Sequence, residues 1–228
     1  MNRRGFLVAT GGTLALAGCA SNGGDDDDEA TVREGTAEIV ESEVFAAPLF
    51  SSGGGEEVPW LQIDVENSSD APHGRLRVES RFLSDGEVIT THEATTGYLP
   101  PETTWRYYTR EEQLDLEAID DVETEIADAE PQAMSTELEA ATVLEENFSV
   151  GSTTVSISGE IDLGDEDPET VAVVVPVYDE GGRLRGTLTD TESDPTSSID
   201  FSADTAHFRT PHERDEPDSY EILVFDGD

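Results

Sequence analysis

The chain has 228 residues and carries 53 acidic against 12 basic side chains, for a formal net charge of −41. Every basic residue is an arginine, and no basic stripe could neutralise phosphates, so nucleic acid is excluded as a partner. Acid spread this widely repels itself in dilute buffer, but at about 1 M salt the Debye length falls to about 3 Å and screens the repulsion. The composition indicates a protein adapted to high salt. The alternative, a disordered acidic chain, conflicts with the patterned apolar runs described below.

Residues 1–18 have the layout of an export signal. Arg3 and Arg4 precede a short apolar run, an order that resembles the twin-arginine signal. The run is too short to cross a hydrocarbon core of about 30 Å, which favours a removed signal over a membrane helix. Leu16, Ala17 and Gly18 then lead to Cys19 in a pattern that resembles a lipobox. We therefore expect lipid on Cys19 and a protein held on the extracellular face of the cell membrane; the alternative is a buried N-terminal helix that ends in Cys19.

Cys19 is the only cysteine in the chain. A single cysteine excludes an intrachain disulfide and a cysteine-rich zinc site, and its position at the expected anchor excludes a thiolate ligand for a blue-copper site. Residues 19–35 are rich in glycine and aspartate, and like charges extend such a segment. We expect it to be an acidic tether, with loose binding of cations by its aspartate run as the alternative.

Residues 36–130 are expected to form a first β-sandwich domain. Short runs with alternating apolar positions predict strands, separated by glycine, proline and aspartate turns. The predicted strands are residues 37–45, 60–65, 75–83, 87–92, 100–108 and 122–127, with a loop or short helical turn at 111–121.

Residues 131–138 read as a linker and residues 139–228 as a second β-sandwich domain. Its predicted strands are residues 143–150, 153–161, 171–178, 183–189, 199–201 and 220–225. The strand at 171–178 is apolar on both faces, which is typical of a central strand. Pro176 lacks the N–H that a sheet ladder needs, so we expect a bulge or an edge position there.

The two predicted domains repeat one strand-and-turn unit. Residues 72–91 align without a gap on residues 168–187, and both segments pass from proline through an apolar run and an aromatic residue to a tight turn. The repeat predicts an all-β protein with two tandem sandwiches. In this alignment Val171, Val173 and Val177 replace the arginines at positions 75, 77 and 81.

Val175-Pro176-Val177-Tyr178-Asp179, followed by Glu180-Gly181-Gly182, is similar to the motif of the FxLYD family. Tyr178 and Asp179 match that motif, whereas Val175 and Val177 replace its Phe and Leu. In the first copy only Phe82 and the Asp85-Gly86 turn survive. The resemblance implies immunoglobulin-like sandwiches in a surface lipoprotein, and it implies no catalytic residues.

Few residues suggest chemistry. There is no Gly-x-Ser-x-Gly nucleophile motif. His207 and His212 could hold a cation across a loop, but we favour a plain surface loop, and we expect no metal or other cofactor. Asn67 and Asn147 begin N-glycosylation acceptor patterns, with Asn67 the better candidate because it lies in a predicted turn.

Arg75, Arg77 and Arg81 fall on the outward face of one predicted strand. They could form a contact patch for an anionic partner, but pairing with carboxylates on neighbouring strands is the favoured interpretation.

The sequence thus predicts a non-catalytic interaction or envelope module with an unidentified protein or glycan partner. The alternative is a lipoprotein that binds a small solute or ion and delivers it to a membrane partner. A pocket between the domains lined by Trp60, Trp105 or Tyr107 would favour the alternative.

Overall fold

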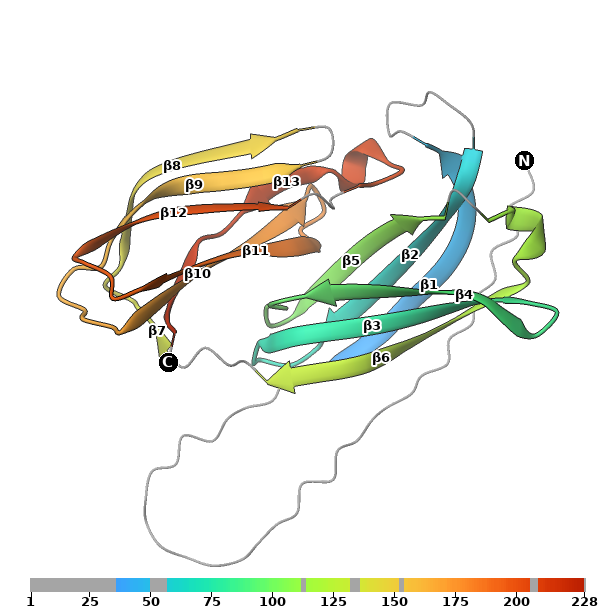
Figure 1. Cartoon of the computed structure of the whole chain (residues 1–228), viewed down its shortest axis with the longest axis horizontal. Coiled ribbons are helices and arrows are strands. Elements are labelled where there is room, and N and C mark those ends of the chain that lie inside the picture. Colours follow the sequence, from blue (N-terminus) through green and yellow to red (C-terminus); the bar gives the residue numbers. More distant parts are fainter. Residues whose placement is uncertain are drawn as a thin grey trace, which may run out of the picture.

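The computed structural model describes residues 36–49, 57–111, 114–131, 136–151, 154–205 and 209–227. Within these ranges the chain is nearly all β-strand, with two single-turn 3-10 helices and no α-helix, and the strands pack as a β-sandwich fold (Figure 1). We call residues 36–131 the first half and residues 136–227 the second half.

The first half contains six strands and one 3-10 turn. They are β1 (Ala37–Pro48), β2 (Glu57–Asn67), β3 (His73–Ser84), β4 (Glu87–Thr96), β5 (Thr103–Arg110), η1 (Leu116–Ala118) and β6 (Asp121–Pro131). The sheet β1-β2-β5 packs on the sheet β4-β3-β6, because their alternating apolar residues share one buried cluster. Leu61, Leu76 and Phe82 are fully buried in that cluster.

The second half has the same plan. Its elements are β7 (Thr136–Glu137), β8 (Thr142–Val150), β9 (Val155–Asp162), β10 (Thr170–Asp179), β11 (Leu184–Ser193), β12 (Ser198–Thr205), η2 (Glu213–Asp215), β13 (Pro217–Tyr220) and β14 (Leu223–Asp226). The sheet β12-β9-β8 covers a sheet built on β10, which pairs with β11 on one side and with β13 and β14 on the other. A second buried cluster fills the space between them.

Strand register is alike at equivalent positions of the two halves. Ile39 of β1 pairs with Val65 of β2, and Val143 of β8 pairs with Ile161 of β9. Each of these pairs is followed at once by the same register shift. Trp105 pairs with Val65 in the first half, and Ile199 with Ile161 in the second. The predicted correspondence between the halves therefore holds strand for strand in these sheets.

The gap-free alignment of residues 72–91 on 168–187 is wrong by one residue along β10. Leu76, Val78 and Phe82 face the first core, and the matching core residues of β10 are Val171, Val173 and Val177. The hairpin after β10 is one residue longer than the hairpin after β3, which restores the alignment in β11. The outward arginines at 75, 77 and 81 therefore correspond to Thr170, Ala172 and Pro176, and not to the three valines.

β10 is a central strand, as its two apolar faces predicted. Residues Val171–Val177 are all buried. Pro176 does not lie at an edge; instead the partner strand is interrupted, since β13 ends at Tyr220 and β14 begins at Leu223. The break falls opposite the proline, which cannot donate to the ladder. The predicted linker 131–138 includes β7, which pairs with β14. The domain boundaries stay a prediction.

Candidate functional site

The two halves meet where β5 lies beside β11. Leu184 of β11 pairs in parallel with Trp105 of β5 and is fully buried in the first half's core. A second apolar contact joins Tyr98, which follows β4, to Ala172, Val174 and Phe225 of the second half. The outer face of β10 is therefore covered by the first half, and this is why its second face is also apolar.

A buried ion pair lies beside this junction. Arg106 of β5 donates from Nε to Asp64 Oδ1 at 2.7 Å and from Nη2 to Asp64 Oδ2, a bidentate arrangement across paired strands. Glu41 of β1 lies 3.6 Å from the same guanidinium. Gln62 of β2 donates to Glu41 at 2.8 Å. These four side chains project from the outer face of the β1-β2-β5 sheet, opposite its core face.

Asp215 of η2 links this face to the second half. Its carboxylate accepts hydrogen bonds from the Tyr108 hydroxyl at 2.8 Å and from Arg183 Nη2 at 2.6 Å. Its backbone carbonyl accepts a hydrogen bond from Arg185 Nη1 at 2.6 Å. The Arg185 guanidinium also lies over the Tyr108 ring, 4.9 Å from the centroid. Asp215 is fully buried, and its carboxylate and backbone carbonyl together join η2 to β5, to the β10–β11 hairpin and to β11.

The β10–β11 hairpin is held in place by Asp179. Its carboxylate accepts from the backbone N–H of Gly181 at 2.9 Å, from the backbone N–H of Arg183 at 3.1 Å and from Arg183 Nε at 2.9 Å. Arg183 is thereby fixed between Asp179 and Asp215. The Tyr-Asp sequence that carries the FxLYD resemblance thus has a structural role at this hairpin.

Burial sets the titration of this network. Burial lowers the pKa of Arg185 to about 10, and the neighbouring Tyr108, Asp179 and Asp215 limit that fall. Burial also raises the pKa of Tyr108, and its hydrogen bond to Asp215 raises it further. Burial alone would lower the pKa of Arg106, but the hydrogen bond and charge of Asp64 outweigh burial and raise it. At neutral pH Arg106 and Arg185 are therefore charged and Tyr108 is neutral.

The network balances its charges internally. Asp64, Asp179 and Asp215 each accept from an arginine side chain. Both oxygens of each carboxylate are hydrogen-bonded within the protein, so a substrate would have to displace one of these partners. Removing one partner of such a buried pair typically costs about 3–5 kcal/mol, since the other charge stays buried. The arrangement is suited to holding the halves in one orientation.

A second polar cluster lies between β4 and β5 of the first half. His92 Nε2 is 2.9 Å from the Tyr107 hydroxyl, and His92 Nδ1 is 3.6 Å from Glu111 Oε1. Burial lowers the pKa of His92 and raises the pKa values of Tyr107 and Glu111. A raised phenol pKa keeps Tyr107 protonated, so this trio lacks an activated nucleophile.

Several predicted residues lie outside the described part of the chain. These are the export and lipidation residues Arg3, Arg4, Leu16, Ala17, Gly18 and Cys19, the tether at 19–35, and His207. Their roles stay predictions. His212 is described, and its ring stacks on Phe45 with centroids 5.9 Å apart.

The outward arginines of β3 are paired with carboxylates. Arg75 lies 3.5 Å from Glu130, and Arg77 lies 3.1 Å from Glu93. Arg81 contacts Glu125 and lies 2.9 Å from Glu79. The structure therefore favours cross-strand pairing over an open anion-binding patch at these residues.

Asn67 does not lie in a turn. It is the last residue of β2, it is fully buried, and its Nδ2 donates to the backbone carbonyls of Ala71 at 2.8 Å and Pro100 at 3.0 Å. This burial argues against a glycan on Asn67 in the folded protein. Asn147 is exposed on β8, and its modification stays a prediction.

The aromatic residues suggested for a pocket between the halves do not share one. Trp105 is buried in the first core, and Tyr107 packs against that core. Trp60 is buried in a separate cluster with Ala47 and Tyr108. The observation that would have favoured the solute-binding alternative is therefore not made at these residues, and that alternative stays a prediction.

The sequence pattern alone did not reveal the junction network. Asp64 stands out in hindsight, because it interrupts a strand whose neighbours are buried Ile63 and Val65. Arg183 and Arg185 flank a hairpin in a second half that is otherwise strongly acidic. Neither signal identifies the partner residue, since Asp215 is 30 residues from Arg185.

Across the described residues, no cluster of three or more His, Cys, Asp or Glu side chains is arranged to hold a metal ion. The same part of the chain contains no helix long and apolar enough to cross a membrane. No protein-family model matches the chain, and no curated protein matches it either.

Proposed function

We propose that this protein is a lipid-anchored, non-catalytic surface module that presents two β-sandwich units as one rigid body in a high-salt environment. The observation that carries the proposal is the junction network. Its buried charged side chains pair with one another, and they tie η2 and β11 to β5. In an enzyme, buried charged side chains often serve the substrate, whereas those of the junction network are engaged with one another.

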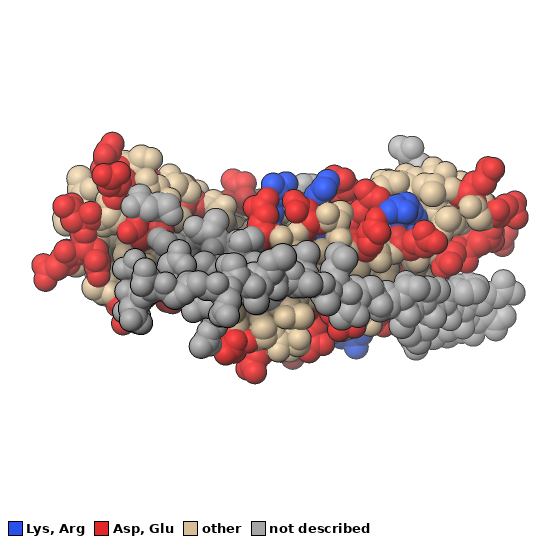
Figure 2. All heavy atoms as spheres, turned by 90° about the horizontal axis from the view of Figure 1, so that it is seen from below, with Lys and Arg blue, Asp and Glu red and all other residues tan. Residues whose placement is uncertain are grey.

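The surface supports the high-salt part of the proposal. Acidic side chains are exposed at both ends of the face shown in Figure 2, whereas the basic side chains visible there lie over its centre and right. The outer face of β12-β9-β8 has Glu145, Glu160 and Asp200 in one cross-strand row. Like charges directly opposite one another destabilise a sheet unless salt screens them.

The anchoring part rests on Cys19, and the non-catalytic part rests on the junction network, so the two parts need separate tests. For anchoring, cells that express the full chain or its Cys19→Ser variant would be fractionated at molar salt. We expect the wild type in the membrane fraction and the variant in the soluble fraction; equal membrane retention of both would refute anchoring. For catalysis, the folded protein would be screened against ester, glycoside and peptide substrates. Turnover that a point change in the junction network abolishes would refute the non-catalytic role.

A further inference from the structure

The repeat gives each half an equivalent tip. We define the second-half tip as residues 179–185 with η2, and the first-half tip as residues 84–89 with η1. In both hairpins the register shifts at the same place: Phe82 pairs with Thr90 and Leu83 with Val88, whereas Val177 pairs with Gly186 and Tyr178 with Leu184. Val88 is therefore the structural equivalent of Leu184, and the bulged Ile89 is the equivalent of Arg185. A 3-10 turn precedes the last strands in each half.

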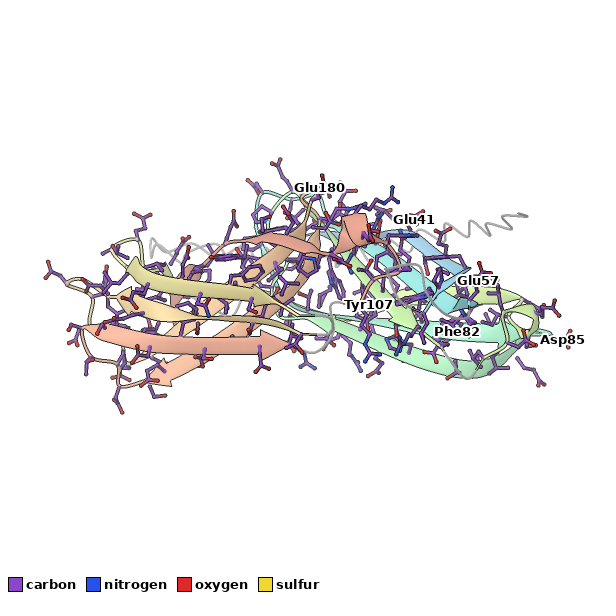
Figure 3. The ribbon with its side chains drawn as sticks, turned by 90° about the horizontal axis from the view of Figure 1, so that it is seen from above. Glu41, Glu57, Phe82, Asp85, Tyr107 and Glu180 are labelled. Atoms are coloured by element: carbon purple, nitrogen blue, oxygen red, sulfur yellow. The ribbon has the colours of Figure 1, made fainter. Side chains whose placement is uncertain are left out.

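The second-half tip is a docking surface. Leu184 is 0% exposed and Arg185 is 4% exposed, because both pack on the outer sheet and core of the first half. At the first-half tip the equivalent residues are open. Val88 is 54% exposed and Ile89 is 41% exposed, and both rank among the exposed large apolar side chains of the described residues. Figure 3 places Asp85 at the end of the first half remote from the second half, and Glu180 where the halves meet.

We propose that the first-half tip docks onto the outer sheet face of a partner protein, and that this face combines apolar side chains with Arg or Lys. The proposal rests on the proposed function as an interaction module and names the surface and partner that it uses. The precedent lies within the chain, where the equivalent tip already docks on a sheet face that carries Trp60, Tyr108 and Arg106.

Charge specifies the partner further. The exposed apolar pair shares its tip with exposed carboxylates, whereas the second-half tip carries arginines. The exposed carboxylates of the hairpin and of η1 with its flanks are Asp85, Glu87, Asp115, Glu117 and Asp120. Asp120 ties the end of the η1 segment to the hairpin, because the Asp85 backbone N–H donates to Asp120 Oδ2 at 2.6 Å and the Asp120 backbone N–H donates to the Leu83 carbonyl at 2.9 Å. Cationic side chains on the partner would complement these carboxylates.

The same carboxylates disfavour other occupants. The equivalent sheet face on a second copy of this chain would be β12-β9-β8, where Ser158, Glu160 and Asp200 replace Gln62, Asp64 and Arg106. That face offers carboxylates to an acidic tip. An anionic membrane surface would repel the tip for the same reason.

Photo-crosslinking of the full chain in its own membranes at molar salt tests the proposal. A benzophenone amino acid replaces Val88 in one variant and Leu144 in the control, which is matched because Leu144 is 53% exposed on β8. We expect an adduct from position 88 and none from position 144. The crosslinked peptide should lie on a sheet face of a partner protein beside Arg or Lys.

Binding of the identified partner, once purified, would then be measured with the wild type, with Val88→Asp combined with Ile89→Asp, and with Leu144→Asp. We expect the double variant to bind at least about tenfold more weakly and the control to bind as the wild type does. Both sites are exposed, and an unchanged far-ultraviolet spectrum checks folding.

Three results would overturn the inference: no adduct at position 88 above the control, an adduct to lipid or to another copy of this chain, or unchanged binding by the double variant. Any of these, found while Cys19 still anchors the protein and no turnover is detected, would leave the proposed function standing.

Discussion

Replacing Arg106 by methionine should strongly destabilise the protein. The variant keeps an unbranched side chain of similar reach but removes the cation from a pair whose side chains are 10% and 6% exposed. Asp64 would then keep only Gln62 Nε2 as a side-chain donor, at 3.4 Å, with Glu41 as a neighbouring like charge. We expect the free energy of unfolding to fall by about 3–5 kcal/mol, the usual cost of stranding a buried charge.

Unfolding in urea at molar salt would measure this loss, because guanidinium chloride is itself a salt and would change the screening. The matched control is Arg75→Met, since Arg75 and its partner Glu130 have side chains that are 55% and 49% exposed. Exposed pairs contribute about 0–1 kcal/mol, so the control should change little.

A double variant tests whether the loss of stability comes from leaving the Asp64 charge without its partner. Asp64→Leu combined with Arg106→Met replaces both charges by apolar groups, which often restores or even raises stability relative to the single change. The reasoning would be refuted if Arg106→Met cost no more than Arg75→Met, or if the double variant lost the sum of the two single losses.

Three further predictions follow from the same contacts. Asp215→Asn should uncouple the halves, so that two probes give different urea midpoints: tryptophan fluorescence, which reports only on the first half, and circular dichroism, which reports on both. The exposed control Asp218→Asn should keep the two midpoints coincident. Coincident midpoints in both variants would contradict the coupling. Asn67→Asp should lower the free energy of unfolding in urea by about 3 kcal/mol or more, because a buried donor becomes a carboxylate facing carbonyl oxygens. The exposed Asn147→Asp should lower it by under about 0.5 kcal/mol. Equal losses in the two variants would refute this account. Burial lowers the pKa of His92 below its unfolded value of about 6.5, although the charge of Glu93 opposes this shift. The unfolded chain therefore binds that proton first, and stability falls as pH drops through about 6.5. His92→Gln should flatten the dependence between about pH 8 and pH 5.5, and an unchanged slope would show that burial between Tyr107 and Glu111 does not keep His92 neutral.

Local pattern was sufficient for most of the fold. Alternation of apolar residues located the strands, and self-similarity predicted that Ile199 takes the place of Trp105, which the shared register bears out. The one-residue error along β10 has a physical cause. Residues Val171–Val177 are all apolar apart from Pro176. The period-two pattern therefore gives no information about which face of the strand meets the core. Only packing decides that Val173 faces its own core while Val174 faces Tyr98.

The sequence by itself determined the charge regime, the all-β class and the repeat, because these depend on composition and on spacing between near neighbours. The tertiary structure alone decided the junction, where Asp64, Arg106 and Tyr108 of the first half meet Arg185 and Asp215 of the second. Those residues are far apart in the chain, and each is unremarkable among 53 acids and 12 arginines. A buried charge is recognised only by the partner that offsets its desolvation, and that partner is set by how two sheets pack.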